Sequence, residues 1–167
     1  GLLVFHPFSA PRPDGRLRVD FLDVDQGDCA LLTFPDGRTM LIDGGGRFNY
    51  STKITNDYGV PEFFEPDIPS IGESVVSEVL WERGLDSVDL LVVTHGDIDH
   101  SQGLIDVMKN FRVRGLIVGN AKKRSQTLDE LYHLAAEENI PVTTTIAGDV
   151  FEIGGVRIET LWPPQNL

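Results

Sequence analysis

Cysteine is almost absent from this sequence, which has a single one, Cys29, among 167 residues. One cysteine excludes both an internal disulfide and a zinc site built from several thiolates. Because Cys29 begins the apolar run 29–32, we expect it to be a small buried side chain. Long apolar runs are also missing: none reaches the roughly 20 residues of a membrane-spanning helix. Residues 1–8 lack the basic start of a signal peptide, so we expect a water-soluble fold.

Positive charge is scarce, with 14 lysines and arginines against 26 acidic residues and a net charge of -12. Residues 57–100 hold 11 acidic residues and 1 basic residue, whereas residues 101–125 hold 6 basic residues and 1 acidic residue. A solvated face is the simpler interpretation of this basic cluster, because the overall charge opposes non-specific binding of polyanions. Contact with substrate phosphates is the alternative. The cluster consists of Lys109, Arg112, Arg114, Lys122, Lys123 and Arg124.

The chain has enough apolar content, 41%, to bury the core of one domain. Prolines at 7, 11 and 13 and the Asp14-Gly15 pair predict an extended leader over residues 1–16, so the folded domain is expected over 17–167. Periodicity predicts strands and helices in an order that indicates a layered α/β architecture with a mixed sheet. Strands are expected at 17–24, 29–34, 39–42, 90–93, 114–118, 142–146, 150–153 and 156–161, and helices at 73–83, after His100, and at 127–139 with Thr127 and Glu130 as a capping box.

Residues 47–71 show no clear period and are expected to form a long loop. Phe63 and Phe64 within it have two interpretations. They anchor the loop on the core, or they line a substrate groove.

The densest set of metal-ligand residue types in the chain follows the apolar strand 90–93. His95, Asp97, Asp99 and His100 lie within six residues there, at the carboxyl edge of the expected sheet. A simpler alternative is an exposed turn in which Asp99 or Ser101 caps the next helix. Four ligand types after a buried strand favour a metal site. The remaining histidines, His6 and His133, are interpreted as structural or surface residues.

These segments resemble a known family. The run from His95 to His100, together with Asp43 ahead of the glycines at 44–46, resembles the metal-binding signature of the metallo-β-lactamase fold. The segments FLDVDQGD at 21–28 and GESVV at 72–76 are similar to the carboxy-terminal domain of the ComEC-type DNA internalization (competence) proteins. The resemblance implies an αββα sandwich. It also implies that residues 1–16 link to a preceding membrane domain, and that the domain is truncated at its C-terminus, with further ligands beyond Leu167.

The resemblance implies two divalent metal ions, Mn or Zn with Mg possible, and no small organic cofactor. His95 and Asp97 are expected to bind the first ion and Asp99 and His100 the second, with Asp99 and Asp43 as the catalytic residues and Asp43 orienting the motif. Asp97 stands where many members have histidine, and a carboxylate favours harder ions such as Mn²⁺ or Mg²⁺.

Two other residues depart from the family pattern. Asp25 and Gln102 replace glycines, and neither change removes an expected ligand.

The function that the resemblance implies is that of a metal-dependent hydrolase, a nuclease that cleaves phosphodiesters of the DNA strand that is not imported. DNA and the membrane channel domain of the parent chain are the implied partners. The implied location is an extracytoplasmic domain of a bacterial inner-membrane protein. Two alternatives stay open: a hydrolase of small esters or phosphodiesters on the same fold, and a non-catalytic scaffold that guides DNA. Without the further ligands, the isolated stretch is expected to bind metal weakly and to cleave slowly.

Overall fold

The computed structural model describes residues 13–47, 52–55, 61–64, 69–119 and 125–164. The helical elements are η1 (Gly72–Ser77, a π-helical segment), α1 (Glu78–Glu82), α2 (Ile98–Asn110) and α3 (Gln126–Glu137). The strands are β1 (Arg18–Phe21), β2 (Ala30–Thr33), β3 (Thr39–Ile42), β4 (Thr52–Thr55), β5 (Pro61–Phe64), β6 (Ser87–Val88), β7 (Leu90–Val93), β8 (Arg112–Val113), β9 (Leu116–Gly119), β10 (Val142–Thr145), β11 (Val150–Ile153) and β12 (Val156–Glu159).

A mixed sheet of six strands organises the fold, in the order β1-β2-β3-β7-β9-β10. The first three strands pair antiparallel, as the Pro35-Asp36-Gly37 turn predicts, whereas β3, β7, β9 and β10 run parallel. Strand β7 therefore lies inside the sheet between two parallel neighbours. The carboxyl ends of β3, β7 and β9 meet at one edge, which is where the chain leaves β7 for the histidine-rich segment.

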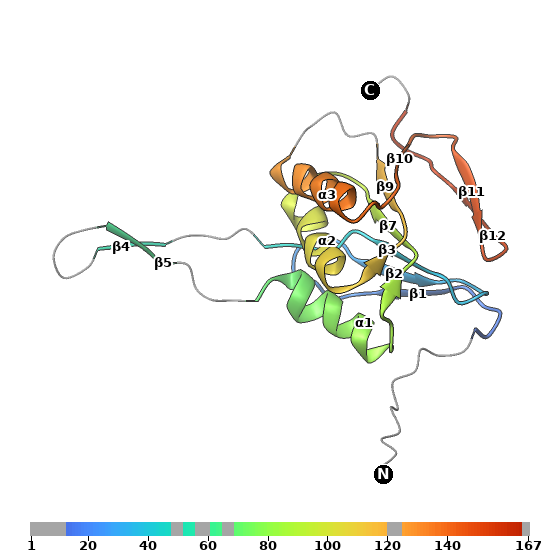
Figure 1. Ribbon diagram of the computed structural model, residues 1–167, viewed down its shortest axis with the longest axis horizontal. Coiled ribbons are helices and arrows are strands. Elements are labelled where there is room, and N and C mark those ends of the chain that lie inside the picture. The colour runs from blue at the N-terminus through green and yellow to red at the C-terminus, as the bar shows by residue number, and fades with distance from the viewer. Residues whose placement is uncertain (1–12, 48–51, 56–60, 65–68, 120–124, 165–167) are drawn as a thin grey trace, which may run out of the picture.

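Both faces of the sheet are covered at its central strands. Leu91 and Val93 of β7 are fully buried among the residues of η1, α2 and α3, because alternate side chains of a strand point to opposite faces. Leu90 and Val92 point the other way and pack with Ile153 of the β11–β12 hairpin. Figure 1 shows the helices on one side of the sheet and that hairpin on the other. This layered α/β arrangement agrees with the predicted fold class.

Most predicted elements are confirmed, and two predictions were wrong in detail. Residues 47–71 were expected to lack regular structure, but they contain the antiparallel pair β4–β5, which projects away from the sheet and helices (Figure 1). The side chains of Phe63 and Phe64 lie outside the described residues. The third helix is capped by Ser125, whose hydroxyl oxygen accepts the amide of Leu128, and not by Thr127. Local spacing alone did not distinguish these two hydroxyl residues.

Several single-residue predictions can be compared with the structure. Cys29 is 2% exposed, and burial together with the nearby Asp43 carboxylate raises the pKa of its thiol to about 12. His133 lies on the surface of α3, beside Glu137, and His6 lies outside the described residues. Within the part of the chain that the structure describes, no helix combines the length and apolarity needed to cross a bilayer.

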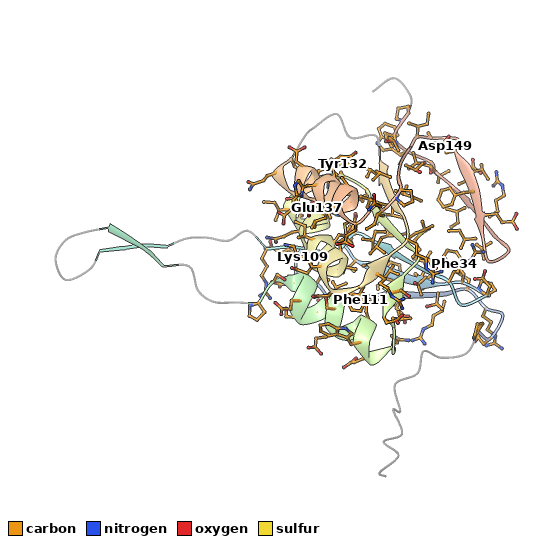
Figure 2. All side chains as sticks on the ribbon, in the orientation of Figure 1. Phe34, Lys109, Phe111, Tyr132, Glu137 and Asp149 are labelled. Carbon is orange, nitrogen blue, oxygen red and sulfur yellow. The ribbon has the colours of Figure 1, made fainter. Side chains whose placement is uncertain are left out.

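The glycine-rich segment after β3 packs directly on the backbone of α2. A Cβ atom on Gly103 would lie 2.0 Å from the carbonyl oxygen of Gly44, closer than any real contact. The absence of side chains lets the two backbones exchange hydrogen bonds: Gly44 donates to the carbonyl of His100 at 2.7 Å, and Gly103 donates to that of Gly45 at 3.0 Å. This contact holds the start of α2 against the end of β3. Figure 2 draws the side chains of the described residues on the same view, with Phe34 and Phe111 among those labelled.

We expect the substitution Gly103→Ala to destabilise the protein by about 2–3 kcal/mol, because the added methyl group forces α2 away from Gly44. Helix propensity alone predicts the opposite sign, since alanine favours a helix interior over glycine by about 1 kcal/mol. Urea unfolding followed by circular dichroism measures the difference. Ala136→Gly, at an exposed position of α3, is the matched control and should cost only about 1 kcal/mol. An unchanged or stabilised Gly103→Ala variant would contradict the close approach.

Candidate metal centre

The register of the sheet places Asp43 beside Thr94. Ile42 is paired with Val92 in the parallel β3–β7 ladder, and the amide of Asp43 donates to the carbonyl of Val92 at 2.9 Å. Asp43 then turns the chain with a φ of 54°, a conformation that aspartate tolerates better than most residues. The first residues beyond two central strands therefore lie next to each other, and their side chains begin the site.

The Asp43 carboxylate is 2% exposed and accepts three hydrogen bonds. Its Oδ1 accepts the Thr94 amide at 2.8 Å, and its Oδ2 accepts the Thr94 hydroxyl at 2.5 Å and lies 3.0 Å from Nδ1 of His100. Burial raises the pKa of the Asp43 carboxyl, although the hydrogen bonds from Thr94 and His100 act in the opposite direction. A divalent cation bound at His100 would favour the ionised form of the Asp43 carboxylate, which is the form that accepts these hydrogen bonds.

These contacts determine which nitrogen of each imidazole is available. An ionised carboxylate only accepts, so Nδ1 of His100 carries the hydrogen that it donates to Asp43. The Thr94 hydroxyl has one hydrogen, which it donates to Asp43, so its oxygen accepts Nδ1–H of His95 at 2.9 Å. In the neutral rings, Nε2 of both histidines then bears a lone pair. The two rings lie with their centroids 4.0 Å apart.

Each Nε2 atom has one carboxylate nearby. Nε2 of His95 lies 3.8 Å from Oδ2 of Asp97, and Nε2 of His100 lies 3.8 Å from Oδ2 of Asp99. This separation is too long for a hydrogen bond. Two ligands of a tetrahedral ion with bonds of about 2.1 Å are separated by roughly 3.4 Å, so each pair needs a shift of only a few tenths of an ångström. The donor set, imidazole and carboxylate, therefore suits divalent cations.

The helix start contributes to this arrangement. Asp97 occupies the N-cap position of α2 in extended conformation, and its carbonyl accepts the amides of His100 and Ser101. Asp99 and His100 lie in the first turn of the helix. The alternative in which Asp99 or Ser101 serves as the cap does not apply, since the cap position belongs to Asp97.

One grouping of atoms allows a different assignment. Asp43, His95 and His100 each bring a ligand-type atom to within 4.8 Å of the others. We nevertheless assign Asp43 an orienting role, because both of its oxygens already accept hydrogen bonds from Thr94 or His100. His95, Asp97, Asp99 and His100 stay the predicted ligands. The structure brings them to one sheet edge as two imidazole–carboxylate pairs, with the two imidazole rings beside each other.

The two departures from the family pattern meet at Arg47. The amide of Arg47 donates to Oε1 of Gln102 at 2.8 Å, and its Nε lies 3.6 Å from Oδ2 of Asp25. Asp25 has a φ of 65°, the left-handed conformation that explains why glycine suits this position. Gly27, two residues later, packs closely against the backbone of Asp99: a Cβ atom on Gly27 would lie 1.6 Å from the Asp99 carbonyl oxygen.

The described part of the basic cluster lies away from these ligands. Lys109 pairs with Glu130 at 3.1 Å, at the opposite end of α2 and about 13 Å along the helix from His100 at 1.5 Å per residue. Arg112 pairs with Asp86 at 2.5 Å and Arg114 with Asp89 at 3.0 Å, near the amino end of β7. Substrate binding by the cluster stays a prediction. Lys122, Lys123 and Arg124 lie outside the described residues.

Comparison of the sequence with known proteins supports a metal centre at this place. The sequence model of the metallo-beta-lactamase superfamily matches residues 22–165, which include every residue of the site. The chain belongs to the metallo-beta-lactamase superfamily. The superfamily is in general hydrolytic, and its members usually bind divalent metals. The chain is also 27% identical over 162 residues to "ComE operon protein 3" of Bacillus subtilis (strain 168). That alignment covers 96% of this chain and 20% of the relative, so the chain spans about a fifth of the relative's length.

Sequence reasoning missed Thr94, which contacts both Asp43 and His95. The signal was present: a hydroxyl residue directly between a buried strand and the first histidine. It was not used because threonine is not a ligand type, and its role depends on the register that brings Asp43 alongside.

We expect Thr94→Val to weaken divalent-metal binding by about 10- to 100-fold, because the isosteric side chain can neither donate to Asp43 nor accept from His95. Thr94→Ser keeps the hydroxyl and should stay within a few-fold of the wild type. Titration calorimetry with Mn²⁺ and with Zn²⁺ on folded variants makes the measurement. Equal affinity of the valine variant and the wild type would show that the hydroxyl does not orient the histidine.

Proposed function

We propose that this chain is the metal-dependent hydrolase domain of a DNA-uptake protein and cleaves phosphodiester bonds of DNA. The observation that carries the proposal is the pair of Nε2–Oδ2 contacts, each of 3.8 Å, that His95 makes with Asp97 and His100 with Asp99. Four ligand atoms in two pairs suit two neighbouring cations. Such cations would polarise a phosphoryl oxygen and activate water, which is the chemistry that phosphodiester hydrolysis requires.

The residues of this chain would divide the work by position. His95 with Asp97 would hold one cation, and His100 with Asp99 the other. Asp43 and Thr94 hold the imidazoles with Nε2 directed away from their own hydrogen bonds. Gly27 presses on the backbone of Asp99 and so limits its movement. Because these supports come from three segments of the chain, the ligands are positioned before any substrate binds.

The choice of DNA as substrate rests on the resemblance to the competence proteins, and the similarity to "ComE operon protein 3" supports that resemblance. DNA would be a transient partner, and a membrane channel domain of the same polypeptide the second one. We propose that the site would lie on the extracytoplasmic side of that membrane. The segment with Lys122, Lys123 and Arg124 is flanked by residues that touch the metal-binding segment. A Cβ atom on Gly119 would contact the carbonyl of Thr94, and one on Gly96 the Ser125 hydroxyl.

The test uses the full-length protein with end-labelled single- and double-stranded DNA, in Mn²⁺, Zn²⁺ or Mg²⁺ and in chelator. We expect cleavage that requires a divalent ion, and a loss of about 100-fold or more in His100→Ala and in Asp99→Asn, because each removes a ligand. His133→Ala, a histidine on the exposed surface of α3, is the control and should retain full activity.

Two results would contradict the proposal. Metal-dependent hydrolysis of bis(p-nitrophenyl) phosphate without cleavage of any DNA would favour a hydrolase of small phosphodiesters. The absence of metal-dependent hydrolysis on every substrate, in protein shown by elemental analysis to hold the metal, would favour a scaffold that guides DNA.

A further inference from the structure

Arg47 carries a positive charge at the edge of an otherwise acidic centre. It follows the glycine segment that begins at Asp43, and its amide is fixed to Gln102 of α2 at 2.8 Å. Gly46, directly before it, packs against the first turn of α2: a Cβ atom there would lie 2.0 Å from the carbonyl oxygen of Ile98. The backbone of Arg47 is therefore attached to the same helix that carries Asp99 and His100.

The guanidinium of Arg47 is held loosely. Its contact with Asp25, at 3.6 Å, is the longest ion pair that any arginine or lysine makes with a carboxylate within the described ranges. The side chains are 43% and 67% exposed, so solvent screens the attraction. By contrast, Arg38 and Asp36 approach to 2.7 Å and Arg157 and Glu159 to 2.8 Å at similar exposure. The backbone of Arg47 is therefore fixed, whereas its guanidinium can leave Asp25 for an anion that binds it more tightly.

An anionic substrate needs such a group here. Asp97 and Asp99 are carboxylates at the centre, and Asp25 lies in the loop that presses on Asp99 through Gly27. Divalent cations would offset the charge of Asp97 and Asp99, but the phosphates on either side of the scissile bond would still meet the carboxylate of Asp25. A guanidinium presents parallel N–H groups that match two phosphate oxygens, which an amide or a hydroxyl cannot do.

Resting on the proposed function, we propose that Arg47 is a substrate-binding residue whose guanidinium binds a phosphate of the nucleic-acid strand beside the metal centre. Asp25 holds the guanidinium when no strand is bound and is displaced by the phosphate. Asp25 therefore competes with substrate. This predicts opposite effects of substitutions at the two ends of a single ion pair.

The experiment measures binding of a short fluorescein-labelled phosphorothioate single strand to the full-length protein by anisotropy, over a range of salt concentrations. We expect Arg47→Gln to weaken binding by about 10-fold and to lower the slope of log K against log[salt] by about 0.7, the loss of one phosphate contact. Asp25→Asn, which tolerates the same positive φ, should tighten binding by about 3-fold. Arg157→Gln is the control, because Arg157 lies on β12 in a pair with Glu159, and should change neither quantity.

Three outcomes would overturn the proposal. Weaker binding in both Arg47→Gln and Asp25→Asn would show a structural pair, and so would a loss of Mn²⁺ affinity in Arg47→Gln. An unchanged salt slope in Arg47→Gln, or no binding by the wild type, would remove the phosphate contact whatever the hydrolysis assay shows. Because this measurement needs no turnover, an inactive protein with the expected binding pattern would contradict only the proposed hydrolysis.

Discussion

The arrangement of the site depends on the contact between the buried Asp43 carboxylate and the two groups beside it, the Thr94 hydroxyl and Nδ1 of His100. Each partner comes from a different element: the end of β3, the end of β7 and the first turn of α2. A carboxylate in this position must be hydrogen-bonded, because burying it without partners would cost several kcal/mol. Its requirement for donors turns both histidines so that their Nε2 atoms are left for another ligand.

The backbone around this carboxylate is arranged to allow that contact. The parallel β3–β7 register sets Asp43 next to Thr94. The hydrogen bonds from Gly44 to the carbonyl of His100 and from Gly103 to the carbonyl of Gly45 hold α2 close enough for His100 to reach Asp43. Side chains at these glycines would force the two backbones apart and break these hydrogen bonds. The small residues of the motif thus have a geometric purpose, while the polar residues have a chemical one. In this acidic chain, Arg47 is a cation whose backbone is attached to α2, the helix that carries Asp99 and His100.

The central strand and the ligand types could be predicted from the sequence, whereas the contacts that depend on tertiary structure could not. The buried strand 90–93 was predictable, because it is apolar on both faces, and the ligand types that follow it identified the centre. Asp43 was associated with the site only through resemblance, since 51 residues separate it from Thr94. The role of Thr94 and the meeting of Asp25 with Gln102 at Arg47 depend on tertiary register, which no local pattern encodes. The strands β4 and β5 were missed because prolines and the lack of a period favoured a loop.

We infer above all that His95 and His100 present Nε2, and not Nδ1, to divalent cations. Anomalous diffraction from crystals of the full-length protein soaked in Mn²⁺ or Zn²⁺ tests this claim directly. We expect anomalous peaks about 2.1 Å from Nε2 of each histidine, with Asp97 and Asp99 as the neighbouring ligands and with Asp43 still hydrogen-bonded to Thr94 and His100. Peaks at Nδ1 of either histidine, or on Asp43 with its hydrogen bonds broken, would contradict it.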